Sequence, residues 1–326
     1  MHPAFSVIFL TTLIGIGQGL FLALFTGQVY SLANLIPVQE SLGFYALGSL
    51  LSLLFLALGL ISSVFHLGRP ERAWRAVAMW RTSWLSREVI VLPLFMLLVF
   101  IYGVAHYFGW TQPLFMVADT LPVDLTLIVG VLASVTAFAL FICTAMIYAS
   151  LKFLKEWHTA LTVSNYTLLG LASGFMSAAA FSAYVNNDLV FLFGIWAVIF
   201  TLAGAVSRGA SLIRNRALRD KYGLPTAIGV RHPNMKQLSQ GFMGGAFNTR
   251  EFFHGRTPEA VRLIRWFFLL TVFPIPVVLM AVAYSLESTS LPIAAFGLQY
   301  LGLIAERWYF FAEAKHPQNI YYQSMA

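Results

Sequence analysis

Cysteine is almost absent from this chain, and charged side chains are scarce. Cys143 is the one cysteine among 326 residues, so the chain can form no internal disulfide and cannot supply the cysteine ligands of an iron–sulfur cluster. Only 10% of the residues are charged, whereas 59% are hydrophobic and the mean hydropathy is +0.77. Soluble domains carry about 25% charged residues. The composition therefore excludes an ordinary soluble domain and predicts a membrane protein.

The hydrophobic residues are concentrated in runs that can cross a bilayer. A spanning helix needs about 20 predominantly apolar residues, and eight runs come close to this length: residues 5–30, 42–65, 85–108, 124–150, 160–185, 188–208, 262–284 and 291–307. These runs predict an all-α, polytopic membrane helix bundle, a single domain over residues 1–326 with a polar loop at about 209–261. Pro274 and Pro276 should kink the seventh run.

Ionisable side chains are missing from the middles of these runs. All seven histidines fall at run ends, in loops or near the termini, whereas a membrane cytochrome b holds its haem between histidines inside the bundle. Haem is therefore not expected. Ion-coupled transporters usually keep charged groups near the bilayer midplane. We therefore keep a transporter or a purely structural anchor only as an alternative function for this chain.

Basic residues are missing from one side of the predicted bundle. All 20 Lys and Arg fall at run ends or connections on the same side, five of them between Arg69 and Arg87 and eleven between Arg208 and Arg265. The charged residues of the opposite connections are all acidic, namely Glu40, Asp119, Asp124, Asp188 and Glu287. The positive-inside rule then predicts that the basic side and both termini lie in the cytoplasm.

The most distinctive segment is residues 66–88, which holds five arginines and three tryptophans between two apolar runs. Guanidinium groups reach lipid phosphates and indole rings sit among headgroups, so the segment should lie at the membrane–water boundary. Pro70 can begin a short helix there, because its missing N–H would be unpaired in any case. The candidates for docking a partner protein in this segment are Arg72, Arg75 and Arg81.

His66 and Glu88 are the proton-active residues of the segment. A quinone needs hydrogen-bond donors for its two oxygens and exchanges two protons when two electrons pass. His66, with an ordinary pKa of about 6.5, can donate to an oxygen or carry a proton, and Glu88 can relay one. The residues alone leave another interpretation open, in which His66 caps a helix or contacts headgroups and Glu88 forms a surface ion pair. Arg87 should point away from Glu88, because adjacent helical residues face different directions.

Residues 66–70 (HLGRP) and 83–88 (SWLSRE) resemble the signature of the membrane-anchor subunits of dimethyl sulfoxide reductase-type molybdenum enzymes. The eight-run pattern and the string at 306–316 extend this resemblance over most of the chain. The resemblance implies a quinone-binding site at His66 and Glu88, and we count Arg69 and Arg87 of the same motifs among its quinone-binding residues. It also implies an anchor that holds no haem, iron–sulfur cluster or other metal of its own.

The same resemblance implies partners and a location. An iron–sulfur subunit with four ferredoxin-like clusters would sit on the anchor, and a molybdopterin catalytic subunit would sit on that. Electrons would pass between the nearest cluster and a quinone, either menaquinone or ubiquinone. The chain would span the bacterial inner membrane several times, and its basic residues would face lipid and these subunits rather than nucleic acid.

The polar loop departs from the shorter members of that family. Its segment at 241–255 contains four phenylalanines, which indicates a protein-docking surface, although contact with anionic lipid would explain the basic charge alone. The loop looks like that of the branch serving cytoplasmic sulfite-oxidising enzymes, so electrons would flow from sulfite to quinone. The reverse flow, from quinol to an acceptor such as dimethyl sulfoxide, stays open. The docking candidates in the loop are Asn248, Arg250, Phe252, Phe253 and His254.

Polar side chains inside two of the runs need partners. Gln18 lies at membrane depth in the first run, and we expect it to bond to a neighbouring helix. Asn165 and Tyr166 follow His158 by about a turn and a half and could line a site on the basic side. The fourth run offers nothing comparable beyond Cys143, which is expected to serve packing.

Overall fold

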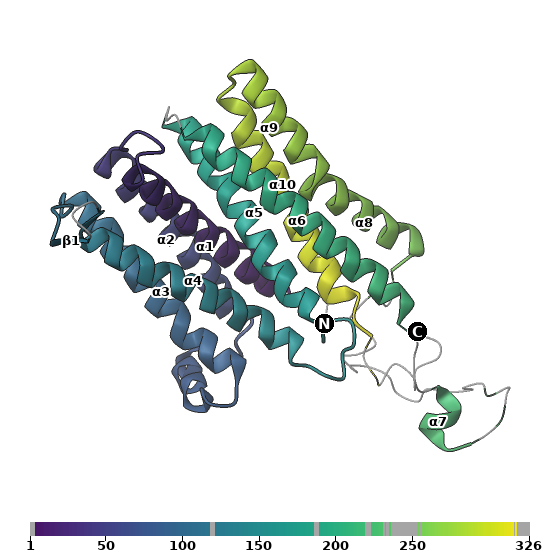
Figure 1. Ribbon diagram of the computed structural model, residues 1–326. Coiled ribbons are helices and arrows are strands. Elements are labelled where there is room, and N and C mark those ends of the chain that lie inside the picture. The colour runs from purple at the N-terminus through teal and green to yellow at the C-terminus, as the bar shows by residue number, and fades with distance from the viewer. Residues whose placement is uncertain are drawn as a thin grey trace.

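The computed structural model is a bundle of long helices lying side by side (Figure 1). It describes residues 4–117, 121–185, 189–218, 223–230, 232, 235, 253, 256–315 and 317. The long helices are α1 (Phe5–Leu32), α2 (Leu47–Val64), α3 (Trp84–Tyr107), α4 (Leu125–Ala149), α5 (Ala160–Tyr184), α6 (Val190–Ala217), α8 (Pro258–Val272), α9 (Pro274–Leu286) and α10 (Ser290–Ala312). The short elements are the π-helix η1 (Ser41–Ala46), the 3₁₀ helix η2 (Pro70–Met79), α7 (Leu224–Ile228) and the antiparallel strands β1 (Phe115–Val117) and β2 (Leu121–Val123), with Phe115 opposite Val123.

Seven helical segments of the described chain are long and apolar enough to cross a membrane, with α8 and α9 counted together. The remaining long helix, α10, has 23 residues, or about 34 Å at about 1.5 Å per residue, which is also long enough. Its hydropathy is lower because it carries Gln299, Glu306 and Arg307, all of which are buried inside the bundle. The predicted all-α, polytopic helix bundle is confirmed.

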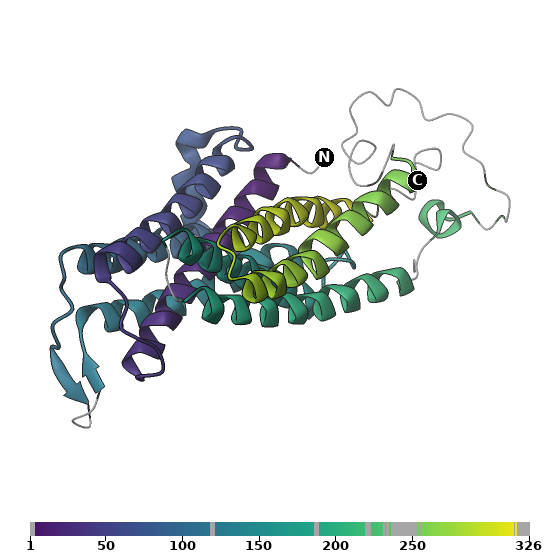
Figure 2. The same cartoon turned by 90° about the horizontal axis from the view of Figure 1, so that it is seen from above.

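Successive passes alternate in direction and define two ends of the bundle (Figure 1). We call the end with η2 and the α4–α5 connection the basic end, because it carries the arginines of 69–87 and Lys155. The other end has the β1–β2 hairpin and the α9–α10 turn, and we call it the acidic end after Asp124 and Glu287. Figure 2 shows the hairpin projecting beyond the helices.

Helices α1 and α5 lie at the centre of the bundle, and 72% and 83% of the residues in their most apolar stretches are buried. Glycines let their backbones touch. A Cβ on Gly174 would collide with the backbone of Gly19, and a Cβ on Gly19 would collide with the carbonyl oxygen of Gly170. Small residues at such a crossing allow the close van der Waals packing that holds helices together in lipid.

The helix ends agree with the predicted runs to within a few residues, except around the polar loop. Helix α6 continues to Ala217, nine residues beyond its predicted end, and α8 begins at Pro258 instead of residue 262. The connection between them is therefore shorter than predicted. The reason is packing: the last turns of α6 are polar in composition but bury Arg208, Ser211 and Leu212 against the bundle.

The predicted kink in the seventh run is confirmed. Helix α8 ends at Val272 and α9 begins at Pro274, with Phe273 between them at φ −109° and ψ −78°. A proline disfavours the helical conformation of the residue before it and removes a backbone donor, so the long apolar segment divides into two helices at this point.

Candidate functional site

Glu88 points into the bundle near the basic end. Ser83 caps α3, because its side chain accepts a hydrogen bond from the Ser86 amide at 3.4 Å. This start places Glu88 on the buried face of the second turn, where only 7% of its surface is exposed. The hydroxyl of Thr144 on α4 donates a hydrogen bond to the Glu88 carboxylate. Glu88 is thus an interior acid held by a neutral partner.

Arg87 points the other way, as expected. Its Nε donates to the carbonyl of Trp80 at 3.0 Å and its Nη2 to the carbonyl of Arg81 at 2.8 Å. Its guanidinium also lies 4.2 Å from the centre of the Trp84 ring. Arg87 therefore fastens the end of the arginine-rich segment to α3 and does not neutralise Glu88.

His66 lies just beyond the end of α2 and is exposed, as is Arg69. Partial burial lowers the pKa of the His66 imidazole below its ordinary value, which favours the neutral ring near pH 7. His66 and Glu88 therefore lie at the same end of the bundle, one at its surface and the other inside it. The geometry does not join them into a single pair.

Helix η2 and the turn that follows it present the predicted docking arginines to the outside. Arg72, Arg75 and Arg81 are exposed, and so are Trp74 and Trp80, with 70% and 52% of their surfaces accessible. The predicted short helix after Pro70 is confirmed, and it has the exposed mixture of cationic and indole groups that a membrane boundary favours.

The predicted docking residues of the polar loop are mostly outside the described residues, namely Asn248, Arg250, Phe252 and His254. Phe253 is described and is partly buried. Its ring lies 5.2 Å from that of Tyr309 and 6.2 Å from that of Trp308, centre to centre. Phe253 therefore packs on α10, which ties this point of the loop to the bundle.

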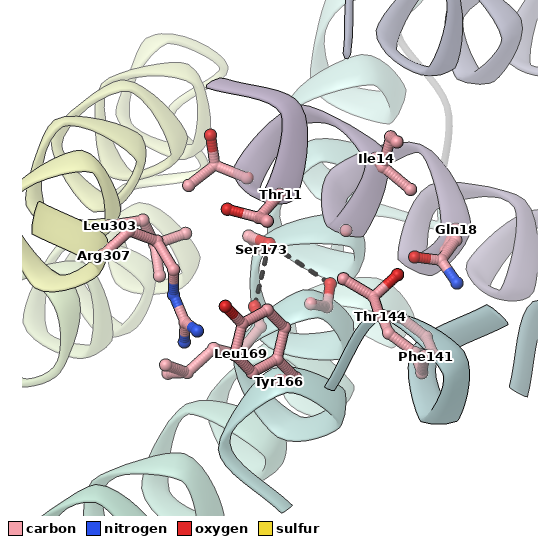
Figure 3. Close-up of a pocket in the computed structure, with 13 residues that line it drawn as sticks. Thr11, Ile14, Gln18, Phe141, Thr144, Tyr166, Leu169, Ser173, Leu303 and Arg307 are labelled. Carbon is pink, nitrogen blue, oxygen red and sulfur yellow. Dashed lines mark hydrogen bonds between the residues drawn. The ribbon is translucent and has the colours of Figure 1, made fainter. Parts of the chain in front are cut away.

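A small polar cavity lies beside Thr144, between α1, α4, α5 and α10 (Figure 3). Its volume is about 20 Å³, room for about one water molecule or one ligand oxygen. Gln18, Thr144, Tyr166 and Arg307 are among its lining residues. Gln18 also donates to the carbonyl of Ala137 on α4 at 2.8 Å, which confirms that its amide bonds to a neighbouring helix.

Arg307 belongs to a buried cluster of four charged residues, which we call the ion cluster. Glu306 forms ion pairs with two arginines. One carboxylate oxygen lies 2.7 Å from Arg208 Nε and the other lies 2.7 Å from Arg307 Nε. Arg208 Nη1 also lies 3.6 Å from a Glu313 oxygen. The side chains of Arg208 and Glu306 are fully buried. The cluster therefore joins α6 to α10 and carries its charges in compensating pairs.

Arg307 lines the cavity and has one donor atom that no described residue satisfies. Arg307 is 4% exposed, and its guanidinium lies 4.0 Å from the centre of the Tyr166 ring. Its Nη1 atom is buried and has no hydrogen-bond partner among the described residues. Buried donors normally find an acceptor, so this N–H indicates a place for a water molecule or a ligand oxygen.

Sequence reasoning missed Thr144 and the ion cluster. It placed Tyr166 near a possible site on the basic side but did not include it among the predicted site residues. Arg208 and Arg307 stood at the predicted ends of runs, where charged residues usually meet water. The available signal was the pair Glu306–Arg307, an acid next to a base within a helix that is otherwise apolar. Nothing local in the sequence pairs Glu306 with Arg208, which is 98 residues away.

A second polar chain lies at the acidic end. Tyr102 donates to Gln28 at 2.8 Å, Gln28 donates to Thr126 at 2.6 Å, and Thr126 donates to Asp124 at 2.8 Å. Leu92, Phe95 and Val99 occupy the buried face of α3 between Glu88 and Tyr102. The two polar regions are therefore separated by apolar packing along this helix. Within the described ranges, no group of three or more His, Cys, Asp or Glu could hold a metal ion.

Comparisons with known proteins agree with the resemblance inferred from the motifs. The chain is 63% identical over 326 residues to a sulfite dehydrogenase subunit from Allochromatium vinosum, and the match covers 100% of both chains. The family model described as DMSO reductase anchor subunit (DmsC) matches residues 1–226, the part that contains both signature strings and helices α1 to α6. The chain therefore belongs to the DMSO reductase anchor subunit family.

Proposed function

We propose that this multi-pass anchor passes electrons from an iron–sulfur subunit to a membrane quinone during sulfite oxidation by a molybdopterin subunit. Sulfite and water would give sulfate, two protons and two electrons at the catalytic subunit, and the quinone would take up two electrons and two protons. The relative's name, which is that of a sulfite dehydrogenase subunit, supports the substrate and the direction. We place the basic end and both termini in the cytoplasm of a bacterial inner membrane, by the positive-inside rule.

The observation that carries the proposal is the buried carboxyl of Glu88 at the basic end. Its single described partner is the neutral Thr144 hydroxyl, so its proton can be exchanged without breaking an ion pair. Thr144 also lines the small cavity, and so does Arg307, whose Nη1 has no hydrogen-bond partner among the described residues. We assign Glu88 to proton exchange and Arg307 Nη1 to a quinone oxygen, with His66, Arg69 and Arg87 at the entrance from the surface.

The proposal is tested with unfractionated cell extracts, membranes included, that contain the catalytic and iron–sulfur subunits with and without this chain. Sulfite should reduce decylubiquinone or menadione only when the chain is present, while sulfite should reduce ferricyanide in both preparations. If quinol instead drove reduction of dimethyl sulfoxide and sulfite reduced neither quinone, electrons would flow the other way. Equal quinone reduction without the chain would remove it from electron transfer and favour a purely structural anchor.

We further propose that the iron–sulfur subunit docks on Arg72, Arg75 and Arg81, together with the loop residues Asn248, Arg250, Phe252, Phe253 and His254. The exposed guanidinium groups on η2 and on the turn after it supply positive charge for an acidic partner surface, and like charges at such a contact cost several kcal/mol.

Replacing Arg72, Arg75 and Arg81 together by glutamate should lower retention of the partner subunits on washed membranes at least about tenfold. Arg262→Glu is the matched control, because Arg262 is exposed at the same end but on α8. Retention is measured by immunoblotting the pellet and the supernatant at low and moderate salt. Undiminished retention of the triple variant would place the docking surface elsewhere.

A further inference from the structure

A large cavity lies between α6 and α9 at the acidic end, far from the ion cluster. Its volume is about 900 Å³, within the range of about 300–1,000 Å³ typical of ligand sites. Its walls are apolar side chains, which include Ile195, Val198 and Ile199 of α6 and Val277 of α9. Polar residues gather at its mouth, namely Ser285 in the last turn of α9 and Glu287, Ser288 and Thr289 in the α9–α10 turn.

Two contacts shape this groove. A Cβ on Gly194 would lie 2.5 Å from Met280 Cε, so the helices touch there. The rings of Phe191 and Tyr284 stack with centres 4.5 Å apart. Elsewhere the two helices diverge, and Ile195 and Ile199 stay 42% and 46% exposed. The groove is thus a consequence of well-defined packing and opens toward the surrounding membrane.

The depth of the groove matches one leaflet. Its lining on α6 runs from Val190 to Ile199. These two residues are nine steps apart, or about 14 Å along a helix, whereas half of a hydrocarbon core is about 15 Å. The apolar part therefore has the length of an acyl chain that begins at the membrane boundary, and the polar mouth lies where a headgroup would lie.

The charge at the mouth selects the headgroup. Glu287 is exposed and is the one charged residue among the described residues of the lining. It adopts φ 51° and ψ 36°, a left-handed conformation that usually favours glycine or asparagine. The turn therefore carries a carboxylate at a position where glycine or asparagine would fit more easily. A carboxylate attracts an ammonium group. It repels a phosphate group when no ammonium group lies close by to offset the negative charge.

We propose that this groove binds a phospholipid whose headgroup carries an ammonium group, as phosphatidylethanolamine does. One acyl chain lies between α6 and α9, the ammonium pairs with Glu287, and the hydroxyls of Ser288 and Thr289 donate to the phosphate. A quinone is a poorer match, because its ring oxygens are acceptors and would face a carboxylate. An anionic lipid such as phosphatidylglycerol would meet the same repulsion without the ammonium to offset it.

The test uses the full-length chain, purified in mild detergent and stripped of lipid by exchange. Phosphatidylethanolamine or phosphatidylglycerol with identical acyl chains is added, and bound lipid is counted by native mass spectrometry. We expect at least fivefold more phosphatidylethanolamine to be retained, and a reversed preference for Glu287→Lys. Glu40→Lys is the matched control, an exposed acidic residue of the same end outside the groove, and it should keep the original preference.

Two further variants separate binding from stability. Glu287→Gly relieves the backbone conformation and should abolish the headgroup preference without lowering the Tm. Ala281→Trp fills the groove and should remove one retained lipid per chain. Equal retention of the two lipids by the original chain, an unchanged preference in Glu287→Lys, a co-purified quinone in the groove, or undiminished lipid in Ala281→Trp would each overturn the proposal.

Discussion

Replacing Glu88 by glutamine should lower sulfite-dependent quinone reduction about 100-fold, since general acid–base groups contribute about 10²- to 10⁴-fold. Glutamine has nearly the same shape and can still accept the hydrogen bond from Thr144, so the fold should be kept. What it cannot do is exchange a proton. The measurement is the rate of decylubiquinone reduction by membranes that carry the whole complex.

Two controls make this result specific. Glu156→Gln removes another buried carboxylate near the basic end, and it should leave the rate within about twofold. Glu88→Asp keeps the carboxyl group but shortens the side chain, and it should restore part of the activity. A Glu88→Gln complex that reduces quinone as fast as the original would show that the proton passes elsewhere, and His66 would then be the next residue to test.

Replacing Glu306 by methionine should lower the free energy of unfolding by about 3–5 kcal/mol, the usual cost of removing one partner from a buried ion pair. Glu306 contacts both Arg208 and Arg307 at 2.7 Å. Without it, Arg208 would keep only its contact with Glu313, and the buried guanidinium group of Arg307 would lose its ion pair. Thermal unfolding of the purified chain in detergent measures the effect as a lower Tm.

A compensating variant tests the electrostatic reason for this loss. In Glu306→Met combined with Arg307→Met, one acid and one base are removed together, so Arg208 and Glu313 remain as a balanced pair and most of the lost stability should return. Glu71→Met is the surface control: its contact with Arg72 is 3.8 Å long and both side chains are at least half exposed, so the change should stay below about 1 kcal/mol. An unrecovered Tm in the double variant would mean that shape, and not charge balance, holds α10 against α6.

The elements that sequence reasoning located best are those with a local cause. Trp84 to Tyr107 and Leu125 to Ala149 agree with their predicted runs to within one residue, because membrane helices depend on hydropathy summed over about 20 neighbours. The kink before Pro274 follows from the chemistry of that one residue. The end of α6 was predicted too early, because Arg208 and Ser211 look like residues of a loop until a neighbouring helix covers them.

The candidate site was predicted in part. The direction of Arg87 away from Glu88 follows from helix geometry alone. That Glu88 lies inside the bundle while His66 lies on its surface does not, because both residues stand at similar distances from the ends of their runs. The rotation of each helix about its own axis decides which residues face inward, and that rotation depends on the side chains of other helices.

By itself, the sequence determined that this protein crosses a membrane many times as helices, that its basic residues gather at one end, and that its motifs are those of an anchor subunit. Each of these depends on composition or on residues close together in the chain. Only the tertiary structure decided that Thr144 holds Glu88, that Arg208 meets Glu306, and that Arg307 faces a cavity. The first two contacts join residues 56 and 98 positions apart, and the cavity is lined by four helices between α1 and α10. Helix–helix packing, which no single segment encodes, sets all three.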